Sequence, residues 1–283
     1  MVTIKNKFLK ATISPLGAEL KSLSYMGEER LWQGDKKFWD GSSPILFPVC
    51  SGLKNGEYYF EGQKYAIEKH GFLRFCQFTT ENVSENSATF LFSSNEKTKV
   101  NYPFDFQFRA TFTLKEKSLE VSYAVKNLST APMYFSLGSH EGYFCPEGIE
   151  DYDIIFSEKE TLDTYKINAD GLIDGKENIL KENDILPLKY DYFAEDALIF
   201  KELKSRSVVL KNRNTKKSIK LNFDGFDYFL IWTVAGAPFI CLEPWRGITD
   251  DKDTDQNFKT KEGIITLDGL DTSISAHTIE IID

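Results

Sequence analysis

Large apolar side chains alternate with polar ones over long stretches of this chain. Apolar residues occupy every second position from 104 to 114, and a second alternating run covers 119–125 after a polar turn at 115–118. A period of two is that of a β-strand with one buried face, so the two runs predict a long β-hairpin. Shorter runs predict further strands at 88–92, 208–210, 219–223 and 229–232.

Helical periodicity is weak throughout. No window of about 11 residues carries apolar residues at i, i+3, i+4 and i+7. Segments 35–39 and 196–203 have room for a helical turn or two. Many strands with few helices predict a sandwich or a barrel, and they argue against an alternating βαβ fold.

The length and composition are those of a globular protein with a large core. The 283 residues include 23 Phe and 13 Tyr, enough large side chains to fill a wide interface between sheets. There is no low-complexity linker and no repeat, so we expect a single domain over residues 1–283. The polar region 158–183 is expected to be a long excursion with short strands, and the acidic run 250–253 a solvated loop.

Charge and cysteine content limit the partners. The net charge is -9 and no cluster of Lys or Arg forms a basic patch, which argues against a nucleic-acid partner. The four Cys are far apart and are expected to be reduced thiols. No apolar stretch is long enough for a signal peptide or a membrane helix, so we expect a cytoplasmic protein without a membrane partner. A homodimer is compatible with the sequence.

Two histidines and one glutamate lie in segments rich in glycine and aromatic residues. These are His70, His140 and Glu243. Together they suggest a site for proton transfer on a sugar, because a carboxylate in an aromatic setting tends to have a raised pKa. Glu243 has a structural alternative, which is a buried ion pair with Arg246.

Other candidates also have structural alternatives. Asp196 lies where it could cap a short helix. Trp232 and Trp245 could each offer an apolar face to a sugar ring or belong to the core. His277, in the last strand-like segment, is expected to be structural.

The order of several segments resembles the aldose 1-epimerase (mutarotase) superfamily, and within it the branch of LacX-type proteins. The resemblance extends over nearly the whole chain, and the co-linearity of the segments is more specific than any one of them. The segments that carry it are Gly17-Ala18-Glu19-Leu20, Leu31-Trp32, Trp39, Pro44-Ile45-Leu46-Phe47-Pro48, His70-Gly71-Phe72-Leu73-Arg74, Ser139-His140 with Tyr143-Phe144, Asp196-Ala197-Leu198-Ile199-Phe200, and Ile240-Cys241-Leu242-Glu243-Pro244-Trp245.

The resemblance implies a large antiparallel β-sandwich of the galactose mutarotase-like type, with few short helices and an open cleft on one sheet. It implies interconversion of the α and β anomers of an aldohexose, with Glu243 as base and His140 as acid. General acid–base groups of this kind each contribute roughly 10²–10⁴-fold. His70 and Asp196 would bind the sugar, and Arg74 would contact a hydroxyl or a phosphate. The reaction needs no cofactor and no metal.

Two positions depart from the family pattern. Cys50-Ser51-Gly52-Leu53-Lys54 lacks the Arg that many relatives carry there, and Lys54 or Arg74 is the candidate substitute. Glu141 follows His140 where Pro is common in relatives.

Three other functions stay open from the sequence alone. A hexose-6-phosphate 1-epimerase would need several cations at the cleft. A non-catalytic carbohydrate-binding sandwich would have no reason to keep both His140 and Glu243. A glycosidase would need a second carboxylate opposite Glu243 at roughly 5–9.5 Å.

Overall fold

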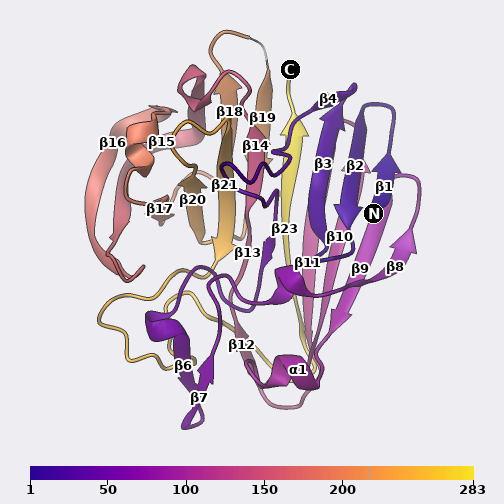
Figure 1. Cartoon of the computed structure of the whole chain (residues 1–283), viewed down its shortest axis with the longest axis vertical. Coiled ribbons are helices and arrows are strands. Elements are labelled where there is room, and N and C mark those ends of the chain that lie inside the picture. The colour runs from indigo at the N-terminus through magenta and orange to yellow at the C-terminus, as the bar shows by residue number, and fades with distance from the viewer. Residues whose placement is uncertain (216) are drawn as a thin grey trace.

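The computed structural model describes residues 1–215 and 217–283. Its largest element is a nine-stranded antiparallel sheet in the order β16-β15-β18-β19-β23-β11-β10-β9-β8 (Figure 1). These strands are β8 (Thr79–Val83), β9 (Ser87–Ser93), β10 (Phe106–Lys115), β11 (Ser118–Asn127), β15 (Tyr152–Ile167), β16 (Ile173–Pro187), β18 (Ser207–Asn212), β19 (Ser218–Asn222) and β23 (Thr272–Ile281).

A second sheet has six strands. Its order is β17-β20-β21-β13-β5, and β14 also pairs with β21. The strands are β5 (Ile45–Leu46), β13 (Leu137–Ser139), β14 (Glu141–Phe144), β17 (Leu198–Lys201), β20 (Tyr228–Trp232) and β21 (Phe239–Arg246).

Smaller sheets complete the structure. The four-stranded sheet of β1 (Val2–Lys5), β2 (Leu9–Ser14), β3 (Glu19–Tyr25) and β4 (Glu28–Glu29) lies on the same side of the molecule as β8–β10 (Figure 1). The two-stranded pairs are β6 (Glu57–Phe60) with β7 (Gln63–Ala66) and β12 (Met133–Phe135) with β22 (Ile265–Leu267). The helical segments are α1 (Glu96–Lys99) and short 3₁₀ turns at Lys54–Gly56, Leu73–Phe75, Ile149–Asp151 and Tyr190–Phe193.

The alternation of apolar residues produces the core. In β10, Phe106, Phe108, Ala110 and Phe112 are buried, whereas the residues that alternate with them are half-buried. Phe47, from the segment that follows β5, packs against the rings of Phe106 and Phe108. The predicted all-β sandwich is therefore confirmed, including the long hairpin of β10 and β11.

Two of three local predictions were wrong. Residues 198–201 form strand β17 and not a helical turn: Leu198, Ile199 and Phe200 are all buried, and the segment pairs with β20. Residues 35–39 do form one turn, in which the N–H groups of Phe38 and Trp39 donate to the Asp35 carbonyl. Region 158–183 lies largely within two long strands, β15 and β16, whose pairing shifts register at several β-bulges. Bulges interrupt the period of two, which explains why the sequence pattern suggested short strands.

The acidic run 250–253 is a loop, but it is not uniformly solvated. Asp250 is buried and forms an ion pair with the buried Lys261 at 2.8 Å. Asp251 and Asp253 are exposed. Among the described residues, no helix is long and apolar enough to cross a membrane.

Candidate active site

The six predicted site residues line one open cleft with a volume of about 680 Å³. They come from distant parts of the chain: His70 and Arg74 from the loop around the 3₁₀ turn Leu73–Phe75, His140 from between β13 and β14, Asp196 from just before β17, Trp232 from β20, and Glu243 from β21. The fold thus brings together every residue that the sequence singled out for this site.

Glu243 lies in the middle of a paired strand. It is opposite Leu230 of β20 in the ladder, and only 1% of it is exposed. Its neighbours Ile240 and Leu242 belong to the main core, so the alternation of the strand directs Glu243 to the other face, toward the cleft. Arg246 donates to the hydroxyls of Ser273 and Ser275, and no ion pair with Glu243 occurs in the described part of the chain. The structural alternative for Glu243 is therefore wrong.

His140 and Glu243 face each other. His140 Nε2 lies 3.4 Å from Glu243 Oε2, and both side chains are buried. Burial lowers the pKa of His140 to about 3 and raises the pKa of Glu243 well above its usual value. Both shifts oppose a net charge on the pair. The two directions correspond to a pair with one proton to exchange: Glu243 carries this proton, and His140 is neutral.

His70 is held in place by the backbone of Ser51. The Ser51 N–H donates to His70 Nδ1 at 3.1 Å, and the His70 N–H donates to the Ser51 carbonyl at 2.9 Å. Because Nδ1 accepts, the ring proton is on Nε2, which leaves a donor for a ligand. Burial lowers the pKa of His70 well below its usual value, so the ring is neutral.

Three tryptophans surround the histidines. Trp39 stacks on His140 with ring centroids 4.9 Å apart, and Trp232 contacts the same ring edge-on at 5.6 Å. Trp245 is buried, and its Nε1–H donates to the Ser139 carbonyl. Trp39 was not predicted as a site residue. It lies in a segment with no local motif, and only its place in the family order gave a signal.

Charged groups lie on both sides of the cleft. Lys69 and Arg74 line it, and neither forms an ion pair with the described residues; an Arg74 Nη2–H donates to the Lys69 carbonyl. Asp196 also lines the cleft, and its side chain accepts from the Ala197 N–H without capping a helix. Lys54 Nζ donates to the Lys252 carbonyl and is not part of the lining, so of the two candidate cations only Arg74 lies at the cleft.

Comparison with known protein families identifies the family of this chain. The model of the aldose 1-epimerase family matches residues 1–261. The chain belongs to the aldose 1-epimerase family. Protein LacX of Lactococcus lactis subsp. lactis is 35% identical over 297 aligned positions, which cover 100% of this chain and 99% of LacX.

Two solved structures are similar over their whole length. A galactose mutarotase related enzyme from Lactobacillus acidophilus is 30% identical, with a TM-score of 0.95 and coverage of 100% of this chain and 97% of that one. A galactose mutarotase-like protein from Lactobacillus casei is also 30% identical, with a TM-score of 0.94 and full coverage of both chains. The resemblance seen in the sequence is confirmed.

One group of side chains in this aldose 1-epimerase fold could offer three donors to a metal. One ligand atom each from His140, Cys241 and Glu243 lie within 4.8 Å of one another. Cys241 is fully buried and does not line the cleft, so His140 and Glu243 are the two members of this group that a ligand in the cleft can reach.

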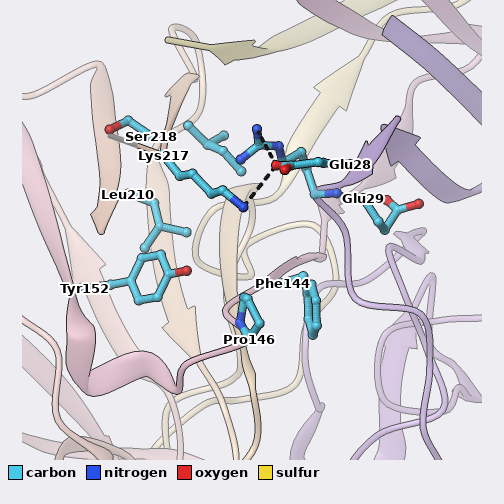
Figure 2. A pocket seen from close by; sticks show the side chains of 10 residues that line it. Glu28, Glu29, Phe144, Pro146, Tyr152, Leu210, Lys217 and Ser218 are labelled. Carbon is cyan, nitrogen blue, oxygen red and sulfur yellow. Dashed lines mark hydrogen bonds and ion pairs between the residues drawn. The ribbon is translucent and has the colours of Figure 1, made fainter. Parts of the chain in front are cut away.

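A separate cavity of about 300 Å³ lies between Glu28, Phe144 and Tyr152 (Figure 2). Its charged groups already have partners: Glu28 binds both Lys217 and Arg30, and Glu29 accepts from the Ser22 hydroxyl and from backbone N–H groups. Its lining includes no histidine. The arrangement is that of a surface hollow closed by ion pairs, and it offers no proton-transfer group comparable to those of the cleft.

Proposed function

We propose that the protein is an aldose 1-epimerase that interconverts the α and β anomers of a hexose. The observation that carries this proposal is the 3.4 Å approach of His140 Nε2 to Glu243 Oε2, with both groups buried in a cleft of sugar size. A pair that holds one proton can give a proton on one side of a substrate and take one on the other.

The proposed reaction starts when the one proton of the pair moves from Glu243 to His140, which leaves Glu243 ionised and His140 protonated. The Glu243 carboxylate takes the proton of the C1 hydroxyl while His140 donates its proton to the ring oxygen. The bond between C1 and the ring oxygen breaks, and C1 becomes an aldehyde. Rotation about C1–C2 and the reverse transfers then close the ring as the other anomer, and the pair returns to its starting protonation.

The remaining cleft residues would bind the sugar. The Nε2–H of His70 is free to donate to a ring or hydroxyl oxygen. Asp196 would accept hydrogen bonds from ring hydroxyls. Trp232 and Trp39 would present apolar faces to the C–H groups of the ring.

Polarimetry tests this function. Freshly dissolved α-D-galactose and α-D-glucose should mutarotate faster with the protein, and the acceleration should be lost with Glu243→Gln. Glu160→Gln is the matched control, because Glu160 is equally buried and is not part of the cleft lining. Equal acceleration by both variants would contradict the assignment of the base.

A second candidate, a sugar with an anionic group such as a hexose 6-phosphate, is favoured by one observation. Lys69 and Arg74 line the cleft without an ion-pair partner in the described ranges. Lys69→Ala should then raise the KM for glucose 6-phosphate more than the KM for glucose. Lys64→Ala is the control, because Lys64 pairs with Glu57 outside the cleft. An equal effect of Lys69→Ala on both sugars would favour the neutral substrate.

The glycosidase alternative finds less support in this geometry. A glycosidase needs a second carboxylate as the working partner of Glu243. The group that faces Glu243 at short range is His140.

We also infer a cytoplasmic location from the four free cysteines, because such thiols persist in a reducing compartment.

A further inference from the structure

A buried polar pair connects the two main sheets directly behind the cleft. His277 of β23 donates from Nε2 to Glu141 Oε1 of β14 at 2.8 Å, and their side chains are 0% and 3% exposed. The Ser139 hydroxyl donates to the other carboxylate oxygen, Oε2, at 2.7 Å. Most of the surrounding core is apolar, so this pair needs an explanation beyond packing.

The position of the pair in the chain suggests its role. Glu141 follows His140 directly, and successive side chains of an extended segment point to opposite faces. His140 therefore faces the cleft while Glu141 faces the core, where it meets His277. Ser139 and Glu141 bracket His140, and the hydrogen bond between them fixes both neighbours of the histidine.

His140 has little else to orient its ring. Its Nδ1 has no hydrogen-bond partner among the described residues, and its Nε2 meets Glu243 only at 3.4 Å. The stacked ring of Trp39 restrains the plane of the imidazole but not its position along the strand. The polar contacts that define this position lie on the core side.

Charge gives the pair a second effect. Burial alone would raise the pKa of Glu141, but His277 and Ser139 together lower it below its usual value, so Glu141 is ionised. The Glu141 carboxylate behind the cleft favours a proton on His140 and on Glu243, and its partner His277 offsets this charge when the imidazole is protonated.

Other charged groups act on the same pair from the cleft. Lys69 disfavours a proton on both members, and Arg74 disfavours one on His140. Asp196 favours a proton on Glu243. Of the neighbouring titratable groups, Cys241 is protonated and His70 is neutral. On the core side, the groups that can carry charge next to the pair are Glu141 and its partner His277.

We propose that Glu141 and His277 are positioning residues: they hold His140 against Glu243 from the core side and place a carboxylate behind the pair. The kinetic part of this inference rests on the proposed function, whereas the orientation of His140 can be tested without it.

The test is Glu141→Gln. The amide keeps the shape, can accept from His277 and can donate to Ser139, but it removes the charge. NMR of protein labelled with ¹⁵N-histidine reports the tautomer of each imidazole, and the chain has only three histidines. We expect a single tautomer for His140 in the wild type and a mixture in Glu141→Gln, with the signals of His70 unchanged.

Kinetics provides the second readout. In Glu141→Gln, kcat should fall about tenfold, which is a part of the roughly 10²–10⁴-fold that an acid–base group contributes. KM should change little, and both limbs of the pH profile should move to lower pH. Glu160→Gln, which also removes a buried carboxylate and can still accept from the Ser205 N–H, should change neither the tautomer nor the profile.

The outcomes separate the two proposals. A folded Glu141→Gln protein with an unchanged His140 tautomer and pH profile would show that the charge of Glu141 does not act on the pair. A folded His277→Phe protein, which lacks the hydrogen bond to Glu141, would overturn the positioning role if its His140 tautomer were unchanged. A changed tautomer in a protein whose wild type turns over no sugar would support positioning and contradict the proposed function. If Glu141→Gln does not fold, Ser139→Ala removes one of the two contacts, and it should shift the tautomer in the same direction by a smaller amount; no shift would again overturn the role.

Discussion

At the scale of single residues, the chemistry of the cleft depends on burial. His140 and Glu243 are ordinary titrating groups in water, but in this cleft their pKa values move apart in the directions that disfavour charge. The sequence indicated which residues to consider, since glycine and aromatic neighbours marked them. It could not indicate the size or direction of these shifts, which depend on side chains from four separate strands and loops.

The pH dependence follows from these directions. A second proton on the pair must go to His140, whose pKa is lowered by burial to about 3. We therefore expect kcat to stay level as the pH falls through the usual histidine range near 6.5, and to decrease only as the pH approaches the lowered value. At high pH, kcat should fall when the pair loses its one proton. A pH–rate profile checks this, and an acid limb centred near 6.5 would contradict it.

At the scale of elements, the loop that carries His70 depends on one close backbone contact. Gly71 has a φ of 69°, and a Cβ at this position would lie 2.1 Å from the Phe47 carbonyl oxygen. The Phe72 N–H donates to the same oxygen at 3.1 Å. A glycine beside His70 was visible in the sequence, but its contact with Phe47, more than 20 residues earlier, was not.

Gly71→Ala should therefore destabilise the protein by more than the roughly 1–2 kcal/mol that left-handed backbone alone costs an L-residue. Gly62→Ala is a matched control, because Gly62 has a φ of 76° and its Cβ would meet nothing within 4 Å. Urea denaturation of both variants measures the difference. Equal losses of unfolding free energy would show that the contact with Phe47 is unimportant.

At the scale of the whole molecule, periodicity predicted the sandwich well where strands are regular. It failed at β15 and β16, where bulges break the alternation, and at β17, where four residues are too few to show a period.

The sequence also gave no indication that one acidic loop has a buried carboxylate. Asp250 accepts from the Lys54 N–H and pairs with Lys261, which joins two loops that are about 200 residues apart in the chain.

Lys261→Met should be strongly destabilising, by about 3–5 kcal/mol, because it leaves the buried Asp250 carboxylate without its partner. It also removes a hydrogen bond to the Ile248 carbonyl. Lys252→Met, which removes only the surface bridge to Asp174, should leave stability nearly unchanged. Chemical denaturation compares the two, and equal midpoints would mean that the buried pair does not hold these loops together.

His140 and Glu243 are proposed to open and close the ring of a sugar together. Magnetisation-exchange NMR on an equilibrium mixture of α and β anomers measures that step directly, because each exchange event is one ring opening and reclosure. We expect exchange to be accelerated by the wild type and by Glu160→Gln, and to be reduced by roughly 10²–10⁴-fold in each of the folded variants Glu243→Gln and His140→Asn. Wild-type exchange rates in both of these variants would contradict this proposal.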